Sequence, residues 1–201
     1  MSKVASSANK SLIRETLSQL EDKLDSCIKF REVDSGFRVL VNGESGMNGC
    51  GSHVGYNVEN KLLPNANFQG LALNPKVCMD PKIIEHEFYH AIGVEHTQER
   101  TDRDEYVKIH FENIIEGDEV QFAKGSKSGQ WAVSQFGLPY DFESVMHYGA
   151  NDYGKDGKRT IETYDPPKQD IIGKAQGVSD GDIMLVKKMY NCDGKKLIKY
   201  I

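Results

Sequence analysis

Residues 86–96 read HEFYHAIGVEH, which places three of the six histidines of the chain and one glutamate in a single short stretch. The residues around this stretch carry the signals of a helix with definite ends. Asp80 is a favourable N-cap residue, Pro81 suits the first helical turn, and Gly93 can take the left-handed conformation that ends a helix. The sequence therefore predicts a helix that begins after Asp80 and stops at Gly93.

The spacing of the histidines is that of a metal site. On an α-helix His86 and His90 are one turn apart on one face, so both imidazoles can reach the same ion. Gly93 permits the sharp turn that brings His96 round as a third ligand. Glu87 points to the side, where a carboxylate can contact a water on the metal without being a ligand, as a general base must. Three neutral histidines leave one position of a zinc ion open for water, which suits a hydrolytic reaction. Cobalt, copper or nickel would also bind three histidines; one Zn²⁺ per chain is favoured by its lack of redox chemistry and by the family resemblance given below, and not by the spacing.

Composition limits the class of protein. The chain has 201 residues, of which 38% are hydrophobic, and this suits the core of one domain. Its 25 basic and 30 acidic residues give a net charge of -5, with no block of Lys or Arg that could follow a phosphate backbone. No apolar run approaches the roughly 20 residues that span a bilayer, and the start of the chain lacks the apolar segment of a signal peptide. We expect a monomer with neither a nucleic-acid partner nor a membrane partner.

The four cysteines are widely spaced and form no CxxC pair, which argues against a cysteine zinc site and against a thioredoxin-like redox motif. Two disulfide bonds are the natural interpretation. Four cysteines allow three pairings, and the pattern does not choose between them. Four buried free thiols in a cytosolic protein are the alternative.

The rest of the chain gives a coarse order of elements. Apolar residues recur at helical spacing over about residues 9–25, so this segment predicts an amphipathic helix. CIKFREV and FRVLVNG, separated by DSG, predict two strands joined by a turn, and GLALN at 70–74 a further strand. Residues 97–178 are polar and rich in Gly, Asp and Pro, which favours loops. A final helix is expected from Ser179, which together with Asp182 resembles a capping box.

A longer string of residues identifies a family. HEFYHAIGVEHTQERTDRDEYVKI, followed by SVMHYG at 144–149, resembles the astacin family of metzincin zinc endopeptidases. The HExxHxxGxxH core is shared by metzincins, whereas RTDRDEYV and a tyrosine two residues after the Met-turn methionine are typical of astacins. SCIKF, GCGSHVGY and VSDGDIMLVKKMYNC match as well, so the resemblance extends from about residue 10 to 192.

This resemblance implies roles for individual residues. His86, His90 and His96 would bind zinc, and Glu87 would be the general base that later passes its proton to the leaving amine. Met146 would be the Met-turn residue that lies under the metal.

Tyr148 would be the astacin tyrosine, a fifth zinc ligand at rest that swings away and hydrogen-bonds the oxyanion when substrate binds. The family pattern also implies two disulfide bonds, Cys27 with Cys192 and Cys50 with Cys78.

The implied fold is α+β, one metzincin-like peptidase domain over residues 1–201 with two lobes and a zinc-binding cleft. The N-lobe, about 1–96, would hold helices and a twisted, mainly parallel five-stranded sheet, and the C-lobe, about 97–201, would be irregular with a terminal helix. CGSHVG is the candidate edge strand for binding substrate. His53 within it is not assigned a catalytic role, because an edge-strand histidine is more often only exposed. The resemblance thus implies a secreted endopeptidase acting on proteins or peptides.

The chain departs from the astacin pattern in several places. Thr97 follows the third histidine where astacins usually have a glutamate that anchors the mature N-terminus, and the usual N-terminal strand is missing. IGKAQG has Ala175 where many astacins have an arginine, with Lys174 beside it, so we do not expect a preference for acidic substrates. The rival hypothesis is a binding module that keeps the zinc site without cleaving; Glu87 and Tyr148, both present here, favour the enzyme.

Overall fold

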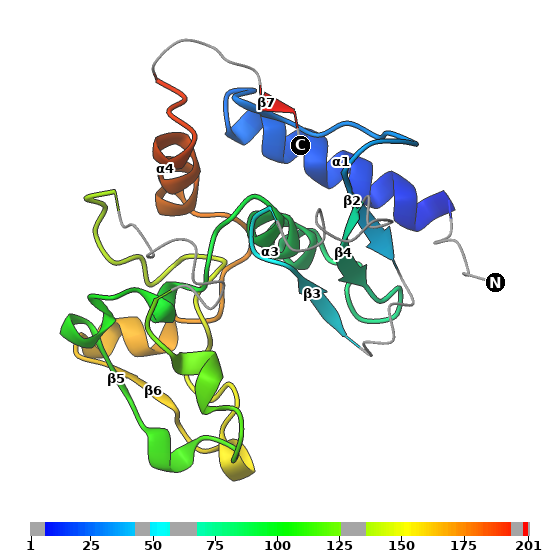
Figure 1. Ribbon diagram of the computed structural model, residues 1–201. Helices are drawn as coiled ribbons and strands as arrows, with labels where there is room; N and C mark the ends of the chain where they lie inside the picture. Colours follow the sequence, from blue (N-terminus) through cyan, green and yellow to red (C-terminus); the bar gives the residue numbers. More distant parts are fainter. Residues whose placement is uncertain (1–6, 43–48, 57–67, 126–135, 194–198, 201) are drawn as a thin grey trace. The chain divides into compact units, whose positions relative to one another are not determined.

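The computed structural model describes residues 7–42, 49–56, 68–125, 136–193 and 199–200 (Figure 1). By its internal contacts the chain divides into two compact units. Unit 1 comprises Met1–Val94 and Val186–Ile201, and unit 2 comprises Glu95–Leu185. The two lobes that the family resemblance implies, about 1–96 and about 97–201, remain an expectation.

In its described residues, unit 1 contains a small mixed sheet and two helices. Its elements are α1 (Ser7–Lys23), β1 (Ile28–Lys29), β2 (Arg38–Asn42), β3 (Cys50–Ser52), β4 (Phe68–Leu73), α3 (Pro81–Ala91) and β7 (Lys199–Tyr200). The strand order is β2-β4-β3, with β2 parallel and β3 antiparallel to β4. The α+β class is therefore as expected. The five-stranded, mainly parallel sheet is not confirmed, since this sheet has three strands among the described residues.

The first predicted strand is much shorter than its sequence pattern. β1 covers only two residues and pairs in parallel with β7, not with β2. Residues 31–37, which follow it, are all exposed. A strand in this segment would have no buried face to stabilise it, so β propensity alone does not extend β1.

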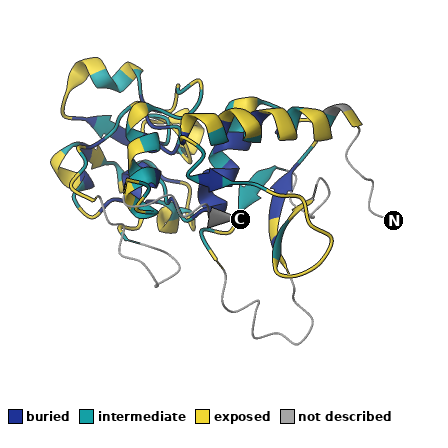
Figure 2. Ribbon diagram, turned by 90° about the horizontal axis from the view of Figure 1, so that it is seen from above, coloured by how far each residue is buried: buried dark blue, intermediate teal, exposed yellow. Residues whose placement is uncertain are grey.

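The core of unit 1 lies between the helices and the sheet. Leu71 and Leu73 of β4 pack with Ile84, Phe88 and Ala91 of α3, and three side chains of α1 cover this cluster, namely Leu12, Ile13 and Leu17. The opposite side of α1 is exposed, as Figure 2 shows. The amphipathic pattern of residues 9–25 thus predicts α1 to within two residues at each end.

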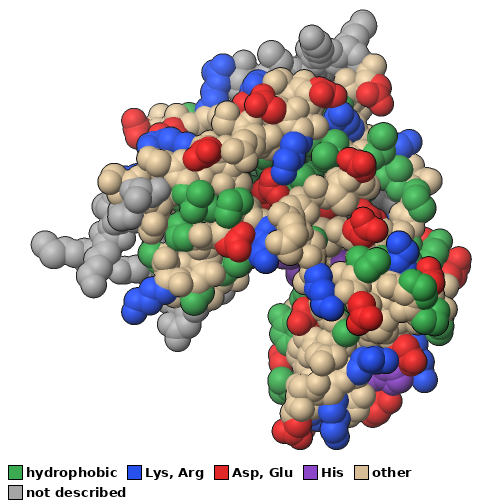
Figure 3. All heavy atoms as spheres, turned by 180° about the vertical axis from the view of Figure 1, so that it is seen from behind, with side chains coloured by type: hydrophobic (Ala, Val, Ile, Leu, Met, Phe, Trp, Pro, Cys, Tyr) green, Lys and Arg blue, Asp and Glu red, His purple; other side chains and the backbone are tan. Residues whose placement is uncertain are grey.

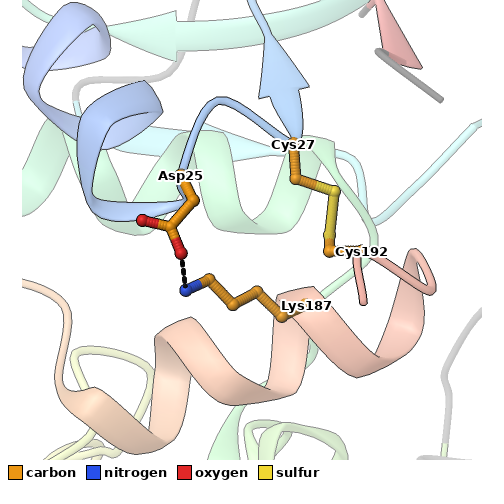
Figure 4. The surroundings of a disulfide bond; sticks show 4 residues. All are labelled: Asp25, Cys27, Lys187 and Cys192. Carbon is orange, nitrogen blue, oxygen red and sulfur yellow. Dashed lines mark hydrogen bonds and ion pairs between the residues drawn. A yellow bond between two sulfur atoms is a disulfide. The ribbon is translucent and has the colours of Figure 1, made fainter. Parts of the chain in front are cut away.

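Two disulfide bonds join residues of unit 1 that are distant in the sequence. Cys27 is bonded to Cys192, and Cys50 to Cys78, which is the pairing that the family resemblance implies. No cysteine is free, so the alternative of four thiols is wrong. Beside the first bond, Lys187 forms an ion pair with Asp25 at 2.6 Å (Figure 4).

Unit 2 is built mostly from short irregular elements. β5 (Val107–Ile109) pairs antiparallel with β6 (Ile161–Thr163). In the described part of the unit, six 3-10 helices lie where the sequence favours loops: Thr97–Glu99, Arg103–Glu105, Phe111–Asn113, Glu119–Phe122, Lys155–Gly157 and Pro166–Asp170. Its apolar core includes Ile114, Phe122 and Ile172.

Two buried arginines satisfy the carbonyl groups of this irregular chain. Arg100 donates to the carbonyls of Leu138 and Pro139 and makes a bidentate pair with Asp102. Arg103 donates to the carbonyls of Gln98 and Phe122. Buried carbonyls outside regular ladders need such donors, so the RTDRDEYV motif has a structural function in unit 2.

Helix α4 (Asp180–Met189) begins with the predicted capping box. The Asp182 N–H donates to Ser179 Oγ, and the Ser179 N–H donates to the Asp182 carboxylate. Asp182 also accepts from Ser144 Oγ at 2.6 Å and from the Val145 N–H at 2.9 Å. One buried carboxylate therefore starts the helix and fixes the turn that precedes Met146.

The surface has mixed charge. On the face that Figure 3 shows, Lys and Arg side chains are interspersed with Asp and Glu. Among the described residues, no helix combines the length and the apolar character needed to cross a membrane.

Replacing a cysteine pair tests how the disulfides stabilise unit 1. The Cys27–Cys192 bond joins residues 165 apart, and the Cys50–Cys78 bond joins residues 28 apart. Because the loss of chain entropy grows with the logarithm of loop length, removal should cost about 5 kcal/mol for the first bond and about 3.5 kcal/mol for the second. Urea unfolding of the two double Cys→Ser variants measures this difference. A larger loss from the shorter loop would contradict the expectation.

Candidate metal centre

Helix α3 begins where the sequence predicts. Asp80 Oδ1 accepts a hydrogen bond from the Lys82 N–H at 3.1 Å, and Pro81 occupies the first helical position. Such a cap stabilises a helix by about 1 kcal/mol. The second half of α3 is buried from Phe88 to Ala91, so the helix that carries the first two histidines is fixed by its packing.

The end of α3 is a Schellman turn centred on Gly93. Gly93 has φ +99°, its N–H donates to the His90 carbonyl at 2.8 Å, and the Val94 N–H donates to the Tyr89 carbonyl at 3.0 Å. This is the hydrogen-bond pattern of an α-helix that ends in a residue with left-handed backbone conformation. A residue with a side chain in place of Gly93 would strain the backbone at this φ. The turn reverses the chain between His90 and His96, as the sequence predicts.

A second glycine packs against this turn. The Gly55 N–H also donates to the His90 carbonyl at 2.8 Å, and Gly55 has φ +64°. A Cβ atom at Gly55 would lie 3.4 Å from the Gly93 Cα. Gln69 of β4, which is buried, donates to the Gly55 carbonyl at 2.9 Å. Gln69 thus holds the segment after β3 against the metal-binding helix, and no sequence motif points to this function.

The three histidines of the motif come together. Each offers a ring nitrogen, and these nitrogens lie within 4.8 Å of one another. Three ligands on one tetrahedral zinc, with Zn–N bonds of about 2.1 Å, would have nitrogens roughly 3.4 Å apart, so a small inward adjustment suffices. Neutral imidazoles without a thiolate suit a zinc ion that keeps a position for water. The residues present therefore fit the metal.

Hydrogen bonding sets the tautomer of His90. Its Nδ1 lies 2.8 Å from the Val94 carbonyl, which can only accept, so Nδ1 carries the proton. Nε2 is then left with its lone pair for a metal. The Schellman turn therefore both redirects the chain and orients a candidate ligand, because Val94 belongs to that turn.

Glu99 orients His96 from the other side of the motif. The His96 Nδ1 lies 3.4 Å from Glu99 Oε1, and the Glu99 side chain is 0% exposed. A carboxylate on the outer nitrogen of a ligating histidine fixes the ring and raises its basicity. Glu99 was not predicted from the sequence; its position three residues after His96 is the signal that could have found it.

Glu87 is a buried carboxylate next to the first ligand. It is 5% exposed, and burial raises its pKa to about 7. Its Oε2 has no hydrogen-bond partner among the described residues. A carboxylate in this environment takes up a proton easily near neutral pH, which suits a general base.

Tyr148 and Met146 lie in unit 2 on the turn held by Asp182. Met146 is fully buried, and its carbonyl accepts from the Thr97 N–H at 3.0 Å. The Tyr148 ring centroid lies 4.4 Å from that of His96. Burial raises the pKa of Tyr148, so the side chain is a neutral phenol at ordinary pH.

A buried histidine supports the backbone of Tyr148. His147 Nδ1 donates to the Tyr148 carbonyl at 2.7 Å, and Tyr140 Oη donates to His147 Nε2 at 2.9 Å. Burial lowers the pKa of His147 to about 4, which keeps the ring neutral and this pattern of donors intact. His147 is therefore a support for Tyr148 and not a further metal ligand.

The other residues named in the sequence analysis are described by their exposure to solvent. Thr97 is buried directly after the third ligand, whereas His53 and Lys174 are exposed. β3 covers Cys50–Ser52 at one edge of the three-stranded sheet, so the candidate edge strand is shorter than CGSHVG.

These features define a class: an α+β fold whose helix carries HExxH and whose Schellman turn returns a third histidine. Comparison with known proteins agrees. The profile of the peptidase family Astacin matches residues 1–191. The chain belongs to the astacin family.

Named relatives support the assignment. Protein SpAN of Strongylocentrotus purpuratus is 35% identical over 195 residues, covering 94% of this chain and 29% of the relative. Low choriolytic enzyme of Oryzias latipes is 34% identical over 186 residues, covering 92% of this chain and 62% of the relative. The chain thus spans less than two thirds of each of these proteins.

A solved structure is similar as well. High choriolytic enzyme 1 of Oryzias latipes, described as a hatching enzyme zinc-protease, superimposes with a TM-score of 0.77 at 31% sequence identity. The match covers 93% of this chain and 84% of the other.

Removing the charge of Glu99 tests its role beside His96. Glu99→Gln keeps the size of the side chain but loses the carboxylate, so zinc affinity should fall roughly 10- to 100-fold, the usual cost of an outer-shell partner. The Kd for zinc is measured by competition with a chromophoric chelator. Glu112→Gln is the matched control, because Glu112 pairs with His110 at 3.1 Å in an exposed position. Equal zinc affinity in the Glu99 and Glu112 variants would remove Glu99 from the metal centre.

Proposed function

We propose that this chain is the catalytic domain of a zinc endopeptidase that hydrolyses peptide bonds in proteins. The observation that carries the proposal is the convergence of His86, His90 and His96 beside the buried carboxylate of Glu87. Membership of the astacin family and the likeness to a zinc-protease structure support it.

The three histidines would hold the metal through one ring nitrogen each. When bound there, zinc lowers the pKa of a coordinated water towards 7 and polarises a carbonyl group. The hydrogen bond from His90 Nδ1 to the Val94 carbonyl leaves His90 Nε2 available for the metal. Glu99, next to His96 Nδ1, orients the His96 ring in the same way. Met146 would be the buried residue beneath the site.

Glu87 is proposed to move the proton. Its carboxylate accepts a proton from the attacking water and then donates it to the nitrogen of the leaving amine, so the carboxylate is regenerated in each cycle. Burial, which brings the pKa of Glu87 near neutrality, suits both transfers.

Tyr148 is proposed to stabilise the developing oxyanion. Its neutral phenol can donate a hydrogen bond to negative charge, and its ring lies against His96. In the resting enzyme the same hydroxyl would be a further zinc ligand, as the family resemblance implies.

The substrate is proposed to be an extended peptide that pairs with an edge strand. β3 lies at one edge of the sheet as described, which supports antiparallel pairing by β-augmentation. Ala175 and the exposed Lys174 give no reason to expect an acidic preference.

We further propose where the protein acts, its oligomeric state and its class of substrate. Two disulfide bonds favour a secreted, extracellular protein. We expect residues 1–201 to form one monomeric peptidase domain with a five-stranded sheet, acting on protein or peptide substrates and not on nucleic acid or membranes. Thr97 carries no carboxylate, so anchoring of a mature N-terminus by a glutamate at this position is not expected.

Replacing the proposed general base distinguishes the hypothesis of an enzyme from that of a zinc-binding module without activity. Glu87→Ala should lower cleavage of denatured casein by roughly 100- to 10,000-fold, the usual contribution of such a base. Zinc content should stay at one ion per chain, because Glu87 is not a ligand. Cleavage is followed with and without a zinc chelator. Stoichiometric zinc in the wild type without chelator-sensitive cleavage would favour the binding module.

Loss of the phenol hydroxyl tests the oxyanion role. Tyr148→Phe keeps the ring contacts with His96 and Phe122 and should lower kcat roughly 10- to 1,000-fold, the range of one lost oxyanion donor. KM for a fluorogenic peptide should change little. An unchanged kcat would exclude Tyr148 from the mechanism.

A further inference from the structure

We propose that Gln98 is a positioning residue that sets the place of Tyr148 relative to His96. The inference rests on the peptidase function proposed above and adds a residue for which the sequence pattern indicates no function. All three residues belong to unit 2, so the contacts are internal to that unit.

Two hydrogen bonds join the segment that follows His96 to the segment of Tyr148. The Thr97 N–H donates to the Met146 carbonyl at 3.0 Å, and the Tyr148 N–H donates to Gln98 Oε1 at 3.1 Å. The first bond joins two backbone groups, whereas in the second a side-chain oxygen takes the place of a backbone carbonyl. Gln98 thus extends the pairing of the two segments as far as Tyr148.

Gln98 is itself fixed by its surroundings. It is 0% exposed, and its carbonyl accepts from Arg103 Nη1 at 2.8 Å. The same nitrogen donates to the Phe122 carbonyl at 2.6 Å, and the Phe122 ring meets the Tyr148 ring edge-on, with 5.8 Å between the centroids. One buried arginine therefore fixes two residues that contact Tyr148, one at its backbone N–H and one at its ring.

The position of the Tyr148 backbone decides where its phenol can reach. The Tyr148 ring centroid lies 4.4 Å from that of His96, a candidate zinc ligand. A donor that is held in place before the reaction stabilises developing charge better than one that must reorient. Without the Gln98 oxygen, the Tyr148 N–H would lose this acceptor, and of the two bonds only the one between Thr97 and Met146 would remain.

Replacing the amide group of Gln98 tests the proposal. Gln98→Met keeps the length of the side chain but offers no oxygen to the Tyr148 N–H. We expect kcat to fall roughly 3- to 10-fold, the factor that one net hydrogen bond provides, while KM for a fluorogenic peptide changes little. Gln169→Met is the matched control, because Gln169 Oε1 accepts from the Thr163 N–H at 2.9 Å in the same unit. A kcat for Gln98→Met equal to that of the control would overturn the proposal.

A conservative variant separates the effect of the oxygen from that of the rest of the side chain. Gln98 Nε2 has no hydrogen-bond partner among the described residues, so Gln98→Glu keeps the acceptor and loses no described bond. It should retain more kcat than Gln98→Met, and an equal loss in the two variants would contradict the proposal. If Gln98→Met does not fold, Gln98→Asn withdraws the oxygen instead and is compared with Gln169→Asn.

A double-mutant cycle shows whether Gln98 acts through Tyr148. In a Tyr148→Phe background the Gln98→Met change should have no further effect on kcat, since the hydroxyl that it positions is gone. A full additional loss in that background would mean that Gln98 acts elsewhere, and would count against the proposal.

A readout without activity separates this inference from the proposed function. In the protein as purified, NOEs between the rings of Tyr148 and His96 report their spacing, and the Tyr148 signals are identified by their absence in Tyr148→Phe. Gln98→Met should weaken these NOEs and Gln169→Met should not. If the wild type fails to cleave protein, the peptidase proposal fails alone; if the NOEs stay unchanged in Gln98→Met, the positioning proposal fails whatever the activity.

Discussion

At Gly93 the backbone takes a φ of +99°, and the metal centre depends on this one left-handed residue. A helix supplies ligands only along its own face, so a third histidine after His90 needs a reversal of the chain. The Schellman turn provides it and also orients His90, because the Val94 carbonyl accepts from the imidazole. The motif therefore encodes a backbone geometry as much as a set of ligands.

The environment of this turn explains much of unit 1. The His90 carbonyl accepts from the N–H groups of both Gly93 and Gly55, and Gln69 fixes Gly55 from β4. The sheet is thereby tied to the helix end through the Gln69 side chain and the backbone of two glycines with positive φ. In unit 2, Asp182 has a similar function, because it holds both the start of α4 and the turn before Met146.

The sequence predicts the elements whose signals are local. The ends of α3, the amphipathic face of α1 and the capping box of α4 each depend on residues within a few positions of one another, and all three are present. The pairing of β1 with β7 joins distant segments, and no local signal encodes it. The irregular unit 2 has weak periodicity, since it is built from short 3-10 helices and irregular segments whose carbonyls accept from buried arginines.

In the candidate site, too, residues that lie close in the sequence are predicted, and residues brought together only by folding are not. Spacing alone places His86, His90 and His96 together, because all three lie in one short segment. Glu99 and Gln69 were missed: what they do follows from burial and from contacts that only the folded chain makes. The function proposed for Tyr148 comes from family resemblance, whereas that of Glu87 also follows from its position beside His86; the burial of Glu87 and the ring contacts of Tyr148 supply a physical basis.

Three imidazoles of this chain are proposed to bind one zinc ion. X-ray absorption at the zinc edge of the purified protein reports this coordination shell. We expect one zinc per chain with three histidine nitrogens at about 2.0–2.1 Å and the remaining ligands oxygen. Sulfur in the coordination shell, or a zinc shell with fewer than three imidazoles, would contradict it.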